Sequence, residues 1–343
     1  MVKPSILVTR AVFAEVLDHL GEHFQVQSNQ SDEIWSKAEL IERMQGKVGV
    51  FTTGSERIDA EVLAACPMLR ICANMAVGFN NFDVDAMTER GVLGTNAPEV
   101  LTQTTADFGF ALLLAAARRI SESEHYLRAG LWRLWRYDMF AGAEVHGSTL
   151  GILGMGRIGQ TVARRGARGF DMQVLYHNRS RLAPDIEAHC GARYVSKEEL
   201  LRSADHLVLV LPYSQQSHHA IGAAELAMMK STATLVNIAR GGIVDDVALA
   251  DALQHGRLAA AGLDVFEGEP TVHPALLALK NVVLTPHIAS ATIPTRMAMA
   301  MLAADNLIGF LTRRQPVTPL NPQVLALPQH AQRQGQTEHP QQG

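Results

Sequence analysis

The sequence predicts an α/β protein of two domains, each built on a doubly wound parallel sheet. Two observations lead to this prediction. Short apolar runs alternate with segments of helical periodicity, and the alternation occurs in two separate series. A length of 343 residues suits two domains, and 47% hydrophobic residues are enough for a core in each. We expect a cleft between the domains, where small-molecule sites commonly lie.

The first series holds four apolar runs of strand length, at residues 5–10, 48–53, 70–78 and 91–96. Helical patterns lie between them at 11–24, 59–66 and 84–91. Gly91 ends the last of these patterns, in the position where a glycine commonly follows a helix. A longer helix is expected over residues 102–120, which begin with several threonines.

The second series begins at Thr149 and holds six apolar runs, enough for a complete doubly wound sheet. They are residues 149–156, 172–177, 206–212, 234–239, 258–266 and 281–286. A helical pattern follows over 295–311, and Pro294 suits its first turn. Residues 323–343 are rich in Gln and Pro and poor in apolar residues, so we expect a disordered tail.

Charge and cysteine content exclude several classes of protein. The net charge is −4, from 30 basic and 34 acidic residues, which disfavours binding to nucleic acid or to an anionic membrane. Cys66, Cys72 and Cys190 show neither a disulfide framework nor metal-ligand spacing, so no metal is expected. The N-terminus has no secretory signal pattern, and the apolar stretch 110–117 is far shorter than the roughly 20 residues of a membrane span. We expect a cytoplasmic protein.

A glycine motif opens the second series. Gly154, Gly156 and Gly159 have the G-x-G-x-x-G spacing, directly after an apolar strand and at the start of a helix. Such glycines allow a tight turn, close approach of a pyrophosphate and close packing of helix on strand. The helix N-terminus, with Arg157 and Ile158, then offers free N–H groups to the anion. This setting predicts a Rossmann-like dinucleotide site, and the alternative is a plain glycine-rich turn.

The end of the next strand indicates which dinucleotide binds. A chain that prefers NAD(H) usually has an acidic residue here for the ribose hydroxyls. This sequence instead has Asn178, Arg179 and Ser180, followed by Arg181. Guanidinium groups bind phosphate well, so we predict NADP(H), with NAD(H) as a weaker alternative. The other interpretation is that these arginines belong to a solvated loop and cofactor choice is loose.

Charged side chains follow three further strands of the series. Arg240, next to Ala239, follows one strand, and its forked donors suit a carboxylate or a ketone–carboxylate pair. Glu269 and His287 follow the other two and make a plausible acid/base pair, since histidine titrates near neutrality and a carboxylate orients its ring. A lone histidine after proline is more often structural, but three such groups at successive strand ends favour a catalytic site.

At these residues the sequence resembles the D-isomer-specific 2-hydroxyacid dehydrogenase family, over nearly the whole chain to about Leu320. The resemblance rests on four ordered signatures, at residues 76–83, 151–159, 237–246 with 261–270, and 285–292. Within the family the chain looks most like the glyoxylate/hydroxypyruvate reductases, including those that act on 2-ketogluconate.

The resemblance implies roles for individual residues. It implies that Arg240 binds and polarises the substrate, that His287 donates the proton and that Glu269 is the histidine's partner. It also implies that backbone amides near Val77 and Gly78 hold the substrate carboxylate. The resemblance further implies that Asp264 and Thr104 lie near the nicotinamide.

The family's substrate-binding domain is discontinuous. The resemblance therefore implies a substrate-binding domain of residues 1–101 and 288–322 around a Rossmann domain of residues 102–287. It also implies that residues 129–147 form an arm that builds a homodimer. Trp132, Trp135 and Tyr137 suit such an interface, although they could equally belong to a local core.

The activity implied by the resemblance is NADPH-dependent reduction of a small 2-keto acid, such as glyoxylate, hydroxypyruvate or 2-ketogluconate, to the D-2-hydroxy acid. Two alternatives remain open. One is a nucleotide-sensing binding protein, like the corepressors on this fold. The other is a dehydrogenase of another small anion, such as formate or phosphite, on the same scaffold.

Overall fold

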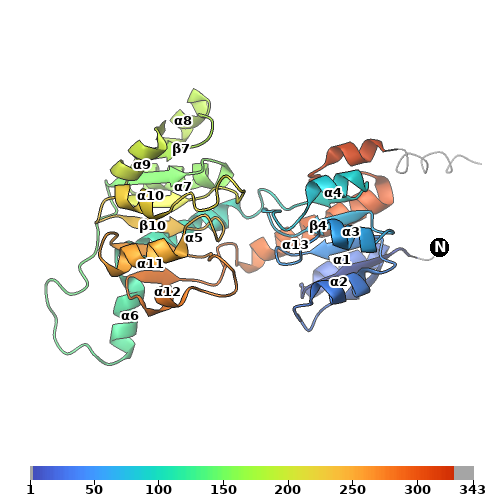
Figure 1. The fold of residues 1–343 in the computed structure, drawn as a ribbon, viewed down its shortest axis with the longest axis horizontal. Helices are drawn as coiled ribbons and strands as arrows, with labels where there is room; N and C mark the ends of the chain where they lie inside the picture. Colours follow the sequence, from blue (N-terminus) through green and yellow to red (C-terminus); the bar gives the residue numbers. More distant parts are fainter. Residues whose placement is uncertain (1–2, 328–343) are drawn as a thin grey trace, which may run out of the picture. The chain divides into compact units, whose positions relative to one another are not determined.

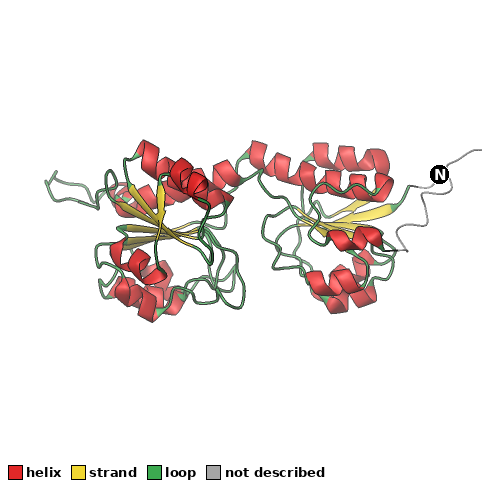
Figure 2. Cartoon of the chain, turned by 90° about the horizontal axis from the view of Figure 1, so that it is seen from above, coloured by secondary structure: helices red, strands yellow, loops and turns green. Residues whose placement is uncertain are grey.

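The computed structural model describes residues 3–327 and divides the chain into two compact units. Unit 1 contains the chain up to Leu101 and again from Thr292, and unit 2 runs from Thr102 to Ala291. Figure 1 traces the chain, and Figure 2 shows helices on both faces of the sheet in each unit. Both sheets are parallel throughout, so the predicted pair of doubly wound α/β units is confirmed.

Unit 1 has a five-stranded sheet in the order β2-β1-β3-β4-β5. Its strands are β1 (Ser5–Val8), β2 (Gln25–Ser28), β3 (Gly49–Thr52), β4 (Ile71–Asn74) and β5 (Leu93–Thr95). Its helices are α1 (Ala14–His23), α2 (Lys37–Met44), α3 (Ala60–Ala65), α4 (Val84–Glu89), α13 (Ile293–Arg313) and the short 3-10 helix η1 (Pro322–Ala326).

The core of unit 1 follows from the alternation of side chains along β1. Ile6 and Val8 point to one face and pack with residues of α1 and α13, such as Leu307. Leu7 points to the other face and packs against α2, α3 and α4, for example with Val62. Because helices cover both faces, the central strands are apolar at nearly every position.

Unit 2 has a seven-stranded sheet in the order β12-β11-β10-β9-β6-β7-β8. Its strands are β6 (Thr149–Leu153), β7 (Gln173–His177), β8 (Ala192–Tyr194), β9 (His206–Leu209), β10 (Thr234–Asn237), β11 (Ala260–Leu263) and β12 (Val282–Leu284). Its helices are α5 (Thr102–Ala117), α6 (Ile120–Arg128), α7 (Arg157–Gly169), α8 (Pro184–Cys190), α9 (Lys197–Ser203), α10 (Ala223–Met228), α11 (Asp246–Gln254) and α12 (Pro274–Ala278).

Two apolar layers sandwich this second sheet. One contains residues of α5 and α7, such as Leu113 and Val162. The other contains residues of α9, α10 and α11, such as Leu201 and Leu249. α6 and the segment after it extend away from the sheet of unit 2 (Figure 1).

Four features differ from the sequence-based expectations. β2 and β8 were not predicted, and the unit 2 sheet therefore has seven strands instead of six. The helix expected over 102–120 ends at Ala117, because Arg119 adopts a left-handed φ of 53° before α6 begins. The disordered tail does not begin at residue 323, since η1 occupies 322–326 and Val324 is fully buried. The remainder of that tail, 328–343, lies outside the described residues.

Among the described helices, none combines the length and apolar character needed to cross a membrane.

Candidate active site

The strand order of unit 2 reverses between β6 and β9, and the loops after the strands gather at their carboxyl edge. In open parallel sheets this reversal point is where ligands bind. The glycine turn follows β6, and the loops after β7, β10, β11 and β12 carry the predicted site residues of this unit apart from Thr104.

The glycine turn has the shape of an anion cradle. Gly154 has a φ of 100°, and a Cβ there would lie 2.8 Å from the backbone of Val210. A Cβ on Gly159 would lie 2.2 Å from the carbonyl oxygen of Gly154, so the helix packs this closely only with glycine. Gly156 is the N-cap residue of α7 and provides no side-chain cap, and the space where its Cβ would stand is open. The first N–H groups of α7, a helix of 13 residues that begins at Arg157 and Ile158, thus face a site that a pyrophosphate could occupy.

The loop after β7 contains one structural residue and two exposed arginines, of which one has an ion-pair partner. Asn178 Oδ1 accepts a hydrogen bond of 2.7 Å from the backbone N of Met155, which ties this loop to the glycine turn. Arg179 and Ser180 are exposed, and no hydrogen bond or ion pair within residues 3–327 engages the Arg179 guanidinium. Arg179 is therefore the cation of this loop that can reach a ligand phosphate.

Arg181, which we expected beside Arg179 as a phosphate ligand, has a different position. Its guanidinium forms a two-point ion pair with Glu187, at 2.9 and 2.7 Å. The hydroxyl of Tyr176 also donates to Glu187, at 2.6 Å. Arg181 and then Tyr176 hold the pKa of Glu187 below its usual range, while burial and this hydrogen bond raise the pKa of Tyr176 to about 12. Arg181 is thus paired with Glu187 of α8, and the expectation that it binds a ligand phosphate is corrected.

His287 and Glu269, which the sequence suggested as an acid/base pair, are in hydrogen-bond contact. His287 Nδ1 lies 2.9 Å from Glu269 Oε2, and Glu269 Oε1 accepts from the backbone N of Phe266 at 2.8 Å. Burial alone would raise the pKa of Glu269, but the two hydrogen bonds and the positive charge of Arg240 lower it. Glu269 is therefore a fixed negative charge at neutral pH, in contact with one nitrogen of the imidazole.

Arg240 is half-buried at the end of β10. Its Nη1 donates to the carbonyl oxygen of Ala239 at 2.7 Å, and burial lowers its pKa while the charge of Glu269 opposes this. An arginine in such a position stays protonated, so a cation faces Glu269. The next residue, Gly241, has to be glycine, because a Cβ there would lie 1.7 Å from the carbonyl oxygen of Phe266. This close contact joins the loops that carry Arg240 and Glu269.

Asp264 has a structural role that sequence reasoning missed. Its carboxylate is almost fully buried and accepts three hydrogen bonds, from Thr285 Oγ1 at 2.7 Å and from the backbone N of Ile288 and of Ala289 at 2.8 Å each. These donors flank His287, whose φ of 53° lies in the left-handed region. Burial raises the pKa of Asp264, although the hydrogen bonds oppose the shift. Asp264 Oδ2 accepts only one of the three bonds, so it retains capacity for a further donor.

The remaining predicted residues lie in two places. Thr104 is half-buried in the first turn of α5 in unit 2. Val77 and Gly78 follow β4 in unit 1. Their carbonyl oxygens accept from Asn96 Nδ2 at 2.7 Å and from Asn74 Nδ2 at 3.0 Å. Within the described residues neither backbone N–H of this pair has an acceptor, so both are available to an anion. Asn74 and Asn96 therefore hold the backbone of Val77 and Gly78, a structural role that sequence reasoning missed.

Comparison with known proteins decides the family. Residues 110–289 match the family model described as "D-isomer specific 2-hydroxyacid dehydrogenase, NAD binding domain". The chain belongs to the D-isomer specific 2-hydroxyacid dehydrogenase family. It is therefore an oxidoreductase with an NAD-binding domain, and the resemblance inferred from the sequence is confirmed.

Members of this family with curated names or solved structures extend the comparison. Glyoxylate reductase of Thermococcus onnurineus is 46% identical over 327 residues, covering 94% of this chain and 97% of the relative. Glyoxylate reductase of Aeropyrum pernix is 47% identical over 341 residues, covering 96% and 99%. The structure of an NADPH-dependent glyoxylate/hydroxypyruvate reductase from Sinorhizobium meliloti, in complex with NADP and malonate, aligns with a TM-score of 0.82 at 34% identity, covering 93% of this chain and 98% of that one.

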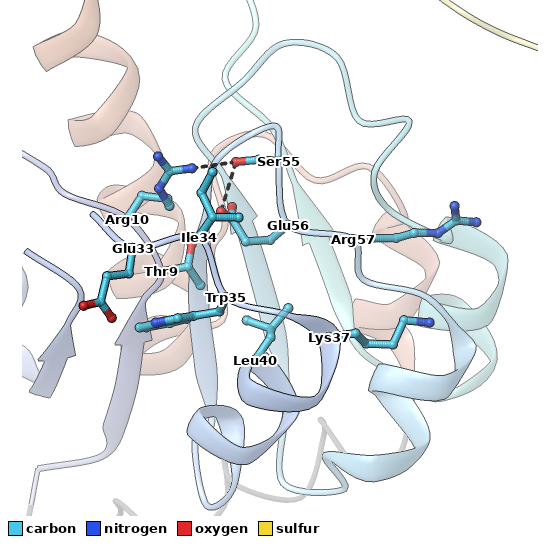
Figure 3. A pocket seen from close by; sticks show the side chains of 10 residues that line it. All are labelled: Thr9, Arg10, Glu33, Ile34, Trp35, Lys37, Leu40, Ser55, Glu56 and Arg57. Atoms are coloured by element: carbon cyan, nitrogen blue, oxygen red, sulfur yellow. Dashed lines mark hydrogen bonds between the residues drawn. The ribbon is translucent and has the colours of Figure 1, made fainter. Parts of the chain in front are cut away.

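Unit 1 of this 2-hydroxyacid dehydrogenase family member also has a cavity of about 220 Å³ (Figure 3). It is lined by residues that follow β1, β2 and β3 and by two residues of α2, and the strand order of this sheet reverses between β1 and β3. Several of its charged groups have partners within the unit. Arg10 donates to Asp32 at 2.8 Å and to Ser55 at 3.2 Å, and Lys37 contacts Asp59 at 2.9 Å. This internal pairing favours a structural role for the polar lining.

Proposed function

We propose that this chain reduces a small 2-keto acid, such as glyoxylate, hydroxypyruvate or 2-ketogluconate, to the D-2-hydroxy acid, with NADPH as the reductant. The observation that carries the proposal is the Glu269–His287 pair at 2.9 Å, with the Arg240 cation beside Glu269. A cation for a carboxylate and a charge-supported imidazole for a proton are the groups that reduction of a keto acid requires. The names of the glyoxylate reductase relatives support the same substrate class.

The loops of unit 2 fit a bound NADPH. The pyrophosphate would be held by the turn at Gly154, Gly156 and Gly159, where no side chain intrudes. Arg179, with Asn178 and Ser180 beside it, would pair with the 2′-phosphate of the adenosine ribose. The relative from Sinorhizobium meliloti is described as NADPH-dependent, which supports this preference. Oδ2 of Asp264 could accept a further hydrogen bond from the carboxamide of a nicotinamide. Thr104 and Ala239 are further candidates for contact with the cofactor.

When bound, NADPH supplies a hydride to the keto carbon. Arg240 binds the substrate carboxylate and the carbonyl oxygen, and it stabilises the negative charge that develops on that oxygen. The N–H groups of Val77 and Gly78 hold the carboxylate. His287 donates the proton to the oxygen through Nε2, because Nδ1 is bonded to Glu269. Glu269 orients the ring and stabilises its charged form.

The proposal assigns a role to each unit. Residues 1–101 and 288–322 would form the substrate-binding domain and residues 102–287 the dinucleotide-binding domain. The cytoplasmic location expected from the sequence stays a prediction.

We also propose a homodimer built by residues 129–147. Trp132, Trp135 and Tyr137 are 53%, 71% and 88% exposed, so a local core does not bury them. Exposed aromatic side chains on one extended segment suit an interface, since burial of each removes a large apolar area from water. A second copy of this chain is the occupant that the resemblance implies.

The decisive experiment is a substrate panel combined with one variant. NADPH and NADH are each tested with glyoxylate, hydroxypyruvate, 2-ketogluconate and pyruvate. His287→Ala should lower kcat by roughly 10²- to 10⁴-fold, the usual contribution of general acid catalysis, while NADPH binding is retained. His255→Ala is the matched control, because His255 is also exposed and paired with a carboxylate, that of Asp251. Full turnover by His287→Ala would remove this histidine from the mechanism.

The panel and one added assay separate the alternatives. Binding of NADPH without its oxidation by any keto acid would favour a nucleotide-sensing protein. Reduction of NADP+ or NAD+ by formate or phosphite, tested separately, would favour the other dehydrogenases.

A second variant tests the cofactor preference. Arg179→Asp should raise KM for NADPH by roughly 10- to 100-fold, the equivalent of one or two charge-assisted hydrogen bonds, and change KM for NADH much less. Arg181→Ala is the control, because its guanidinium is already bound to Glu187. An unchanged preference in Arg179→Asp would contradict the assignment of the phosphate site.

A further inference from the structure

Unit 2 contains a second group of potential ligands, outside the set of Arg240, Glu269 and His287. His218 and His219 lie in the loop after β9, and Glu267 lies in the loop after β11. One ligand atom from each of the three lies within 4.8 Å of the other two. His219 Nε2 is 2.9 Å from Glu267 Oε2, and the two imidazole rings stack with centroids 3.9 Å apart. The function proposed above uses none of these side chains.

The second nitrogen of each imidazole faces an outer partner. His218 Nδ1 lies 3.2 Å from the hydroxyl of Tyr213, and His219 Nδ1 lies 3.9 Å from Asp245 Oδ2. Histidines that bind metals usually have this arrangement, because a polar group on the outer nitrogen fixes the ring and selects the tautomer. Within residues 3–327 no hydrogen bond or ion pair engages Nε2 of His218, and Nε2 of His219 is directed toward Glu267.

The backbone holds these loops together. His219 donates from its backbone N to the carbonyl oxygen of Gly242 at 2.7 Å, and it adopts a left-handed φ of 50°. A Cβ on Gly242 would lie 3.1 Å from the Tyr213 ring and 3.4 Å from His218 Nδ1. The loops after β9 and β10 therefore meet in one arrangement, and that arrangement determines where the two imidazoles lie.

We propose that His218, His219 and Glu267 form a binding site for a divalent transition-metal cation of the zinc class. Two imidazoles and one carboxylate are a ligand set that Zn²⁺ accepts, and they leave a fourth position for water. Tetrahedral ligands at zinc distances lie roughly 3.4 Å apart. Ligand atoms that are up to 4.8 Å apart therefore need to approach by about 1.4 Å at most, while His219 Nε2 and Glu267 Oε2, at 2.9 Å, need to separate slightly. Side chains at an accessible loop surface can do this by rotation. Magnesium and calcium prefer oxygen ligands, and the two imidazoles disfavour them.

The test is a calorimetric titration of ZnCl₂ into the full-length chain after removal of any affinity tag. One saturable site per chain is expected, and CoCl₂ should compete for it while MgCl₂ should not. His219→Ala and Glu267→Gln each remove a ligand. Tyr213→Phe removes only an outer partner, which typically costs 10- to 100-fold in affinity. The two ligand variants should therefore weaken binding by more than Tyr213→Phe does.

His255→Ala is the matched control, since this exposed histidine pairs with Asp251 and lies outside the proposed metal site. The zinc affinity of this variant should equal that of the unsubstituted chain. Circular dichroism checks that each variant is folded, and His218→Ala replaces His219→Ala if the strained backbone of His219 does not tolerate alanine. The proposal is overturned if the unsubstituted chain has no saturable site. It is equally overturned if zinc affinity survives removal of His218 and of Glu267, because the cluster would then be an ion pair only.

Discussion

Replacement of Asp264 by Asn tests whether this buried carboxylate positions His287. The carboxylate accepts three hydrogen bonds, from Thr285 Oγ1 and from the backbone N of Ile288 and of Ala289. An amide keeps one acceptor oxygen and puts an NH₂ group in place of the other, so at least one buried N–H loses its acceptor. A lost charge-assisted bond costs about 1.5–3 kcal/mol, and relief of carboxylate burial offsets part of that. We expect a net loss of about 2 kcal/mol.

For a unit of this size, that loss should lower the melting temperature by about 4–8 °C. The turn carrying His287 should also shift, and a displacement of about 1 Å can reduce kcat by the order of 10²-fold. Thermal unfolding followed by circular dichroism and steady-state kinetics measure the two effects. Asp251→Asn, at an exposed position, is the control. An Asp264→Asn variant with normal melting and normal kcat, but a raised KM for NADPH, would show that Asp264 serves the cofactor alone.

Three further substitutions follow from the contacts described above. Gly159→Ala puts a methyl group 2.2 Å from the carbonyl oxygen of Gly154, so NADPH affinity by fluorescence titration and the melting temperature should both fall. Arg181 keeps the pKa of Glu187 below 4.5, so the stability from this pair is complete above pH 4.5 and is lost as pH falls through the lower, folded-state value. The melting temperature of Arg181→Ala should therefore fall less on acidification than that of the unsubstituted chain. Trp135→Ser should shift the chain toward monomer in analytical ultracentrifugation, and an unchanged mass would contradict the proposed interface.

The fold could be predicted wherever strands are buried on both faces. The runs that became β1, β3, β4 and most of the unit 2 strands are apolar because helices cover both sides of the sheet. β2 and β8 were missed because each lies at the edge of its sheet and has a polar, partly exposed sequence. Each of these two edge strands has one neighbour and little burial, so its hydrophobic pattern is weak, whereas the edge strand β5 is buried and its run was predicted.

The site could be predicted where a motif fixes the chemistry, and less well where distant segments meet. The glycine turn is fixed by local backbone geometry, so its spacing, between an apolar strand and a helix, predicted a dinucleotide site. The role of Asp264 depends on donors more than 20 residues later in the chain, which no local pattern reveals. Arg181 was misassigned because Glu187, six residues on, neutralises it, and acidic residues after an arginine are too common to signal a pair.

The two carboxylates that follow β11 differ in the direction of their pKa shifts, and this separates their roles. Burial dominates at Asp264 and raises its pKa, whereas hydrogen bonds and the nearby Arg240 charge lower the pKa of Glu269. The negative charge in contact with the His287 ring is therefore that of Glu269, while Asp264 binds backbone N–H groups next to this residue. Glu269→Gln should change the pH dependence of kcat, because the charged form of the imidazole loses its partner. Asp264→Asn should lower kcat by a similar factor at every pH. If the two variants gave the same pH profile, the two carboxylates would share one role, and the division inferred from their surroundings would be wrong.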